Sequence, residues 1–351
     1  MASLTSTLAI KSLCGAFFRK RPVPLVLPKK AVIDIETVGR LAPTPSGRMH
    51  LGNVFCALLA WLSARQAGGK VLLRIEDLDQ VRAPRRYAGL LEEDFCWLGI
   101  SWDEGGSRGG PQGPYYQSER SEIYLQCLQK LEKLTYPCFC SRAELHAAEA
   151  PHMSDGRFLY TGRCRGLTAA EIAEKRRQRP PAVRIAVPEE TIRFDDLRDG
   201  PQQALLTKAC GDFVIRRADG VFAYQLATAA DDALMGVTQV VRGSDLLGST
   251  FQQRWLQKLL GLPSPRYGHI PLLTAPDGRR LSKRDGDLDL GALRQRGVRP
   301  ERITGLLGYL AGLLEKPEEA SPGALIPLFD WAKIPKQEVA LTETHCRFLF
   351  G

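Results

Sequence analysis

The stretch RLAPTPSGRMHLGN (residues 40–53) contains the backbone break that decides the fold. Pro43 and Pro45 hold the residues before them in extended conformations. Ser46 and Gly47 can then make a turn. Apolar residues at helical spacing begin directly after His50. The stretch therefore predicts the end of a strand, a turn and the N-terminus of a helix.

The residues on either side extend this pattern. TVGRLAP (37–43) is typical of a short strand. Residues 50–66 are typical of a helix, which Gly68-Gly69 would end. KVLLRIE (70–76) is typical of a buried parallel strand. A strand–helix–strand unit predicts an α/β fold with an open parallel sheet. Ligands of such sheets bind beyond the carboxyl ends of the strands, where helix N-termini favour anions. We expect phosphate near His50, although a plain helix start would show the same residues.

Further elements follow from the same patterns, with a loop at 105–113. We expect helices at 84–98, 119–134, 169–179, 222–236 and 251–261, and strands at 183–187, 212–217 and 238–243. After 287 we expect only short helical stretches and a proline-containing tail.

Charge and hydropathy limit the partners. The chain of 351 residues has a formal net charge of +9, which suits a polyanionic partner but does not require one. No apolar run approaches the roughly 18 residues of a membrane span. Residues 1–33 contain basic residues but no acid. Residues 1–35 are therefore excluded from the fold as a transit peptide, a basic arm or the product of a misassigned start codon.

Three of the nine cysteines lie close together in sequence, in CFCSR (138–142) and YTGRC (160–164). Cys138, Cys140 and Cys164, with the phenolate of Tyr160, could complete the tetrahedral shell of a structural zinc ion. Three buried or free thiols are the alternative. The other six cysteines are scattered and are interpreted as free thiols.

GRRLSKR (278–284) places Lys283 in a loop rich in basic residues. Such a loop can close over a polyphosphate and stabilise developing charge, although a solvated surface loop is the simpler interpretation of these residues alone.

The two motifs together resemble the paired signatures of class I aminoacyl-tRNA synthetases. Further blocks resemble the glutamyl-tRNA synthetase family, and they follow one another in order from residue 40 to 285: RLAPTPSG, HLG, LLRIEDLD (72–79), GPYYQSER (113–120), AYQLATAADD (223–232), GVTQVVRG (236–243) and LSKR. The resemblance implies a Rossmann-like parallel-sheet catalytic domain.

The resemblance also implies an ATP site with magnesium. His50 and Lys283 would stabilise charge on the α-phosphate as a substrate carboxylate attacks it. Asn53 stands where the family usually has a histidine, but its amide can still donate a hydrogen bond. The implied ATP-binding residues are His50, Gly52, Asn53, Ser282 and Lys283.

An L-glutamate pocket is implied in the same way. Glu76 would bind the ammonium group, Arg40 the side-chain carboxylate and Arg242 the other carboxylate, while Tyr224 would donate its hydroxyl. Taken singly, each residue could equally belong to an ordinary ion pair. The implied pocket residues are Arg40, Leu41, Ala42, Pro43, Thr44, Glu76, Tyr224 and Arg242.

A shortened branch of the family, the glutamyl-queuosine tRNA(Asp) synthetases, carries a Cys-x-Cys…Tyr-x-x-x-Cys zinc site in its insertion. Residues 138–164 are similar to it, which implies zinc ligation by Cys138, Cys140, Tyr160 and Cys164. Only residues 284–351 follow the lysine motif, so we expect a short helical C-terminal region and no anticodon-binding domain. Leu246 and Thr228 stand where the discriminating glutamyl-tRNA synthetases usually have tryptophan and asparagine. This branch tolerates apolar residues at both positions, so Leu246 fits it, and Thr228 favours neither group of enzymes.

The implied reaction is activation of glutamate to glutamyl-adenylate without tRNA. Transfer to the queuosine base in the anticodon stem-loop of tRNA(Asp) would follow. Three alternatives remain: a truncated glutamyl-tRNA synthetase acting on tRNA(Glu), a non-catalytic tRNA- or amino-acid-binding relative, and a nucleotidyltransferase for another small acid.

We expect a cytoplasmic monomer, or a plastid or mitochondrial protein if residues 1–35 direct import. The expected divisions are the extension 1–35, a first catalytic half 36–134, a zinc-bearing insertion 135–190, a second catalytic half 191–290 and a helical tail 291–351.

Overall fold

The structure is a computed structural model, and it describes residues 36–141, 144, 159–279, 281 and 288–351. The expectations for residues 1–35, Ser282 and Lys283 lie outside these residues. Within the described part of the chain, no helix is both long and apolar enough to cross a membrane.

The predicted strand–helix–strand unit is confirmed. Strand β1 (Val38–Leu41) leads through the proline-containing turn into helix α1 (Leu51–Gln66), and β2 (Lys70–Leu73) lies parallel to β1. The short strand β3 (Glu104–Gly105) adds to β2 in parallel. It is followed by a 3₁₀ turn, so the expected loop 105–113 is irregular only in its later part.

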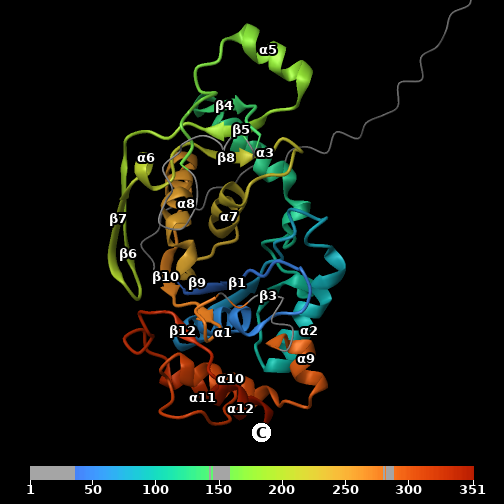
Figure 1. The fold of residues 1–351 in the computed structure, drawn as a ribbon, viewed down its shortest axis with the longest axis vertical. Coiled ribbons are helices and arrows are strands. Elements are labelled where there is room, and N and C mark those ends of the chain that lie inside the picture. Colours follow the sequence, from blue (N-terminus) through green and yellow to red (C-terminus); the bar gives the residue numbers. More distant parts are fainter. Residues whose placement is uncertain (1–35, 142–143, 145–158, 280, 282–287) are drawn as a thin grey trace, which may run out of the picture.

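The chain between residues 191 and 270 contributes four more strands. These are β6 (Thr191–Asp196), β7 (Gly200–Leu205), β9 (Gln239–Gly243) and β10 (Arg266–Ile270), in the order β7-β6-β10-β9. β6, β10 and β9 run parallel, and only β7 is antiparallel. The Thr238 amide next to β9 donates to the Val38 carbonyl of β1 at 3.0 Å, which brings the two sets of strands together (Figure 1). The predicted parallel sheet is therefore confirmed, although β6, β7 and β10 were not predicted.

Alternate residues of these strands enter two different hydrophobic cores, because successive side chains of a strand point to opposite faces. Val71 and Val241 pack with α1 and the C-terminal helices, whereas Leu72 and Val240 pack on the other face. Figure 1 shows these layers, with α1 below the strands and helices α7 and α8 above them.

The other helices before the C-terminal region, outside the cysteine-bearing part, are α2 (Ala88–Leu98), α3 (Ser121–Lys130), α7 (Tyr224–Leu234) and α8 (Leu247–Leu260). Three of the expected boundaries were wrong. α2 begins at Ala88 and not at 84, because a 3₁₀ turn at Arg85–Tyr87 precedes it. α8 begins before residue 251, because a 3₁₀ turn at Ser244–Leu246 feeds directly into it. The helix expected at 119–134 ends at Lys130, and a separate 3₁₀ turn follows.

The cysteine-bearing part of the chain forms a small antiparallel sheet at the end of the molecule away from α1 (Figure 1). Its strands are β4 (Thr135–Cys138), β5 (Ala182–Ile185) and β8 (Phe213–Arg216). The helices nearby are α5 (Ala169–Gln178), which begins at a Thr168–Glu171 capping box, and the short α6 (Leu206–Ala209).

The C-terminal region contains four short helices, α9 (Leu290–Gln295), α10 (Pro300–Leu310), α11 (Pro322–Leu325) and α12 (Glu343–Phe350). The expected short helical C-terminal region is confirmed. One strand was not predicted there, since β12 (Val339–Ala340) pairs in parallel with β11 (Leu273–Thr274). The tail is thereby attached to the chain that precedes the lysine motif.

The packing of α1 on β1 leaves no room for a side chain at Gly39. A Cβ there would lie 2.7 Å from the Cβ of Ala64, so we expect Gly39→Ala to lower the free energy of unfolding by about 1–3 kcal/mol. The matched control is Gly89→Ala in α2, whose added Cβ would meet no atom within 4 Å. Urea denaturation should show Gly89→Ala equal to or more stable than the wild type. Equal stability of all three proteins would contradict the close packing.

Candidate active site and cysteine cluster

His50 is the N-cap residue of α1, at the carboxyl edge of the sheet where an anion site was expected. Its Nδ1 atom accepts a hydrogen bond from the Gly52 amide at 3.2 Å. In the neutral imidazole, this bond places the ring proton on Nε2. His50 therefore combines a directed N–H donor with the positive end of the α1 dipole.

The loop before α1 is held in place by contacts with α2. Gly47 adopts a φ of 126°, which favours glycine. Arg48 pairs with Asp94 at 2.5 Å and with Glu93 at 3.1 Å, and the Met49 amide donates to Asp94 at 3.3 Å. These contacts fix the direction from which the chain enters the helix.

A cavity of about 500 Å³ opens beside this loop. Every predicted glutamate-binding residue lines it, and so do two of the predicted ATP-binding residues: Arg40, Leu41, Ala42, Pro43, Thr44, Glu76, Tyr224, Arg242, His50 and Asn53. Gly52 is not in the lining but orients His50 through its amide. Leu246 lines the cavity, whereas Thr228 is fully buried outside the lining.

One wall of the cavity is a set of paired buried charges. Arg74 donates to Asp232 at 2.7 Å and to Glu76 at 3.0 Å, and Arg40 lies 3.3 Å from the same oxygen of Asp232. Burial raises the pKa of the Glu76 carboxyl, and Arg74 and Arg40 offset this only in part. Burial would also raise the pKa of Asp232, but these two arginines outweigh it and lower the pKa.

A second carboxylate, Asp231, supports this wall from behind. It accepts hydrogen bonds from Arg120 at 2.7 Å, the Tyr124 hydroxyl at 2.7 Å and the Gln117 amide at 2.8 Å. Helix α7 is thereby attached to the segment 113–124. All four side chains are at most 2% exposed, so the network is structural and shielded from solvent.

Arg242 forms the opposite wall and has different partners. Its guanidinium donates to Gln253 at 2.8 Å and to Thr250 at 2.6 Å, and it lies 3.5 Å from the Tyr224 hydroxyl. It is 2% exposed. Arg40 shares a carboxylate, whereas no ion pair involves Arg242 in the described part of the chain. Its charge is thus available to a bound anion.

The buried charged residues behind the pocket, Arg74, Asp231 and Asp232, were not predicted as site residues from the sequence. A signal for some of them was present, because Arg74 and the Asp231–Asp232 pair interrupt apolar segments that are otherwise typical of buried elements. Such charges indicate buried partners. The partners themselves lie far apart in sequence, so a single sequence does not show which residues pair.

The chain that follows the lysine motif runs beside His50. Asp289 caps α9 and forms an antiparallel bridge with His50, and the Leu290 amide donates to the Met49 carbonyl at 2.9 Å. The segment that follows the motif is therefore anchored next to the pocket, although Asp289 is 239 residues from His50 in sequence.

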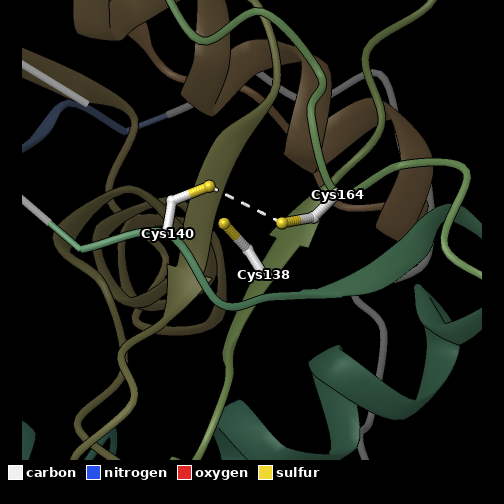
Figure 2. A group of neighbouring side chains, drawn as sticks. All are labelled: Cys138, Cys140 and Cys164. Atoms are coloured by element: carbon white, nitrogen blue, oxygen red, sulfur yellow. Dashed lines mark hydrogen bonds between the residues drawn. The ribbon is translucent and has the colours of Figure 1, made fainter. Parts of the chain in front are cut away.

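The three cysteines predicted as metal ligands lie together at the end of β4 (Figure 2). The sulfur atoms of Cys138, Cys140 and Cys164 are all within 4.8 Å of one another, and those of Cys140 and Cys164 are 3.6 Å apart. The Tyr160 hydroxyl lies 3.5 Å from the Cys138 sulfur and 3.7 Å from that of Cys140. Three thiolates and a neighbouring oxygen are a donor set that can hold zinc.

Arg184 of β5 reaches the same cluster. Its Nε donates to the Cys138 sulfur at 3.2 Å, its guanidinium lies 3.7 Å from the Tyr160 ring centre, and its Nη1 donates to the Asp212 carbonyl at 2.8 Å. The side chain is 7% exposed. A buried cation at this place favours the anionic thiolate form that zinc requires.

The family model described as tRNA synthetases class I (E and Q), catalytic domain, matches residues 36–319. The parallel sheet, the N-cap His50 and the charged pocket thus lie within the catalytic domain of a class I tRNA synthetase.

Relatives of this chain carry a more specific description. The chain is 52% identical to the glutamyl-Q tRNA(Asp) synthetase of Symbiobacterium thermophilum, over 89% of this chain and 98% of that protein. The protein of the same description from Nitratidesulfovibrio vulgaris is 50% identical, over 85% and 93%. The chain therefore belongs to the glutamyl-Q tRNA(Asp) synthetase family.

Longer relatives match as well. Glutamate–tRNA ligase 2 of Alkalilimnicola ehrlichii is 47% identical over 78% of this chain, but the match covers only 58% of that protein. The crystal structure of glutamate-tRNA synthetase from Elizabethkingia anophelis superposes with a TM-score of 0.76 at 29% identity, over 90% of this chain and 70% of that one. These matches agree with the class I fold.

The cysteine cluster predicts a specific loss of metal. Cys138→Ser should release zinc and destabilise the β4-β5-β8 sheet more than the parallel sheet, because a structural zinc ion contributes directly to folding. Metal analysis and hydrogen exchange would measure the two effects. Cys96→Ser is the matched control, since this thiol is exposed and remote from the cluster in sequence. Full zinc content in Cys138→Ser would remove Cys138 from the ligand set.

Proposed function

We propose that this chain activates L-glutamate with ATP to glutamyl-adenylate without tRNA, and then transfers the glutamyl group to queuosine in the anticodon of tRNA(Asp). The observation that carries the proposal is the cavity in which the carboxylate of Glu76 is combined with the guanidinium groups of Arg40 and Arg242. One ammonium and two carboxylates, the charged groups of glutamate, are complementary to this set. The 52% identity to a glutamyl-Q tRNA(Asp) synthetase supports the same substrate.

Each end of glutamate would have its own partner. Glu76 binds the ammonium group and Arg40 the side-chain carboxylate, while Tyr224, which lies beside Arg242, donates its hydroxyl. Arg242 binds the α-carboxylate, which is the group that reacts. Leu41, Ala42, Pro43 and Thr44 form the adjoining wall.

Formation of the adenylate would take place at the start of α1. An oxygen of the α-carboxylate attacks the α-phosphorus of ATP, and pyrophosphate leaves with the electron pair of the broken bond. The His50 Nε2–H and the dipole of α1 stabilise the charge on the α-phosphate, and Asn53 donates its amide. Lys283 would stabilise the same charge on the α-phosphate and Ser282 would contact ATP, while magnesium, when bound, would supply further neutralisation.

The second substrate is a polyanion. The net charge of +9 favours binding of the anticodon stem-loop of tRNA(Asp) through its phosphates. Leu246 in the pocket lining fits the shortened family. Since the relatives reported above are bacterial, we place the reaction in the cytoplasm, or in a plastid or mitochondrion if residues 1–35 direct import.

We also propose that Tyr160 is the fourth zinc ligand. Its hydroxyl is near two of the three sulfurs and accepts a hydrogen bond from the Cys164 amide at 2.9 Å. The ion would have a structural role and take no part in the transfer.

A second candidate is a glutamate–tRNA ligase acting on tRNA(Glu), favoured by the 47% identity to such an enzyme. Glutamate-dependent ATP–pyrophosphate exchange, measured with and without tRNA, separates the two. We expect exchange without tRNA, followed by transfer of labelled glutamate to queuosine-containing tRNA(Asp) but not to the same tRNA without queuosine. Exchange only in the presence of tRNA(Glu) would support the second candidate, and no exchange at all would contradict both.

Lys283→Ala is expected to lower the exchange rate by about 10²-fold or more, because a cation that stabilises transferring phosphate is lost. The unfolding midpoint should stay that of the wild type. Lys208→Ala, an exposed lysine in α6, is the matched control and should keep full activity. An unchanged exchange rate in Lys283→Ala would contradict the assigned role.

Glu76→Gln should raise the KM for glutamate by about tenfold or more, since a charge-assisted hydrogen bond is lost. The raised pKa of Glu76 predicts that wild-type affinity is complete above this pKa and declines as the pH falls through it, at a higher pH than an ordinary carboxyl would give. KM measured from pH 5 to 8 should show this decline, and Glu76→Gln should flatten it. Glu104→Gln removes another carboxyl whose pKa is raised by burial, outside the pocket lining, and should leave the profile unchanged.

A further inference from the structure

Arg242 is a buried cation whose hydrogen-bond partners in the described structure are all uncharged. Its partners Gln253 and Thr250 are neutral, and its Nε lies 3.4 Å from Nε2 of His269. Arg242 interacts with the Asp232 carboxylate only at longer range, where it helps to lower the pKa of that carboxyl. A buried cation that forms no close ion pair is costly, so the groups in direct contact with it must present acceptors. An arginine can only donate, and this requires a lone pair on each partner.

His269 of β10 can meet this requirement in only one protonation state. Its Nδ1 is 2.6 Å from a carboxylate oxygen of Asp196, and its Nε2 is 2.9 Å from the Thr250 hydroxyl. A proton on Nδ1 can be donated to Asp196, which leaves a lone pair on Nε2 for Thr250 and Arg242. A proton on Nε2 would remove this lone pair, so the ring would present an N–H to Thr250 and no acceptor to Nε of Arg242. Both His269 and Thr250 are fully buried, so water cannot substitute for these contacts.

Asp196 is itself firmly placed. Its other carboxylate oxygen accepts hydrogen bonds from the amides of Arg198 at 3.0 Å and Asp199 at 3.1 Å, and from the His269 amide at 3.3 Å. Burial and the neighbouring Arg242 lower the pKa of His269, and Asp196 opposes this only in part. The imidazole therefore stays neutral at pH 7, with its tautomer set by Asp196.

We propose that Asp196 and His269 are positioning residues for Arg242. Asp196 holds His269 in the neutral Nδ1–H tautomer, and His269 in turn fixes Thr250 and Arg242. The guanidinium of Arg242 is thereby kept available to the substrate carboxylate. The relay runs from Asp196 through His269 and Thr250 to the guanidinium. A carboxylate in direct contact with Arg242 would compete with the substrate, whereas this arrangement keeps the carboxylate two groups away. The inference rests on the proposed function, because the substrate is taken to be glutamate.

Two substitutions of His269 test the roles of its two ring nitrogens separately. His269→Gln can place a carbonyl oxygen near the position of Nε2, so it keeps an acceptor for Thr250 and Arg242. His269→Asn reaches only the position of Nδ1 and leaves them without one. We expect His269→Asn to raise the KM for glutamate about tenfold and His269→Gln to stay within about threefold of the wild type. The KM for ATP should be unchanged in both.

Tyr267→Phe is the matched control. Tyr267 lies on the same strand, is fully buried and stacks on His269 with ring centres 6.2 Å apart, but its hydroxyl has no hydrogen-bond partner in the described structure. The substitution should leave both KM values unchanged. In wild-type protein at pH 7, ¹⁵N NMR should show the Nδ1–H tautomer for the imidazole signal that disappears in His269→Gln.

Several outcomes would overturn the inference. Equal KM values for glutamate in the wild type and His269→Asn would do so, as would equal losses in the Gln and Asn variants, which would indicate a packing role alone. An Nε2–H or doubly protonated His269 would also contradict it. Failure of the proposed function is distinguished from these outcomes, because wild-type protein would then show no glutamate-dependent exchange.

Discussion

The ion pair between Arg74 and Asp232 is the contact on which the pocket depends. It joins the end of β2 to α7 inside the protein, and both side chains are fully buried. Burying two charges costs several kcal/mol per ion unless each has further partners, and here Glu76 and Arg40 supply them. Because the pair cannot be broken without leaving an uncompensated charge, the strand end and the helix keep a fixed distance.

This constraint separates the roles of the two arginines in the pocket. Arg40 shares Asp232 with Arg74, so part of its charge is already neutralised within the protein. Arg242 is held by neutral groups and keeps its charge for a ligand. The positive charge is thus partly neutralised at the Arg40 wall and not at the Arg242 wall. This difference suits a substrate with two carboxylates of which only one reacts.

The cysteine cluster also lies beside a buried arginine. Arg184 is a buried cation whose neighbours are a sulfur, an aromatic ring and a carbonyl, so the cluster is the place where its counter-charge can arise. The cysteine cluster and the pocket each place a buried arginine beside groups that can hold a ligand, which are three thiols in one case and the residues of the cavity wall in the other.

The sequence by itself determined the strand–turn–helix at 37–66, the parallel sheet, the pocket residues from Arg40 to Arg242 and the three cysteines, because proline, glycine and apolar spacing act locally and the motifs could be matched residue by residue. Tertiary structure alone decided which charges pair. Asp232 serves Arg74 and Arg40, and His269 stands between Asp196 and Thr250, across separations of up to 192 residues. Burial determines these partners, because a buried charge or hydrogen-bond donor is stable only with a partner close to it in space. That partner can lie anywhere in the sequence.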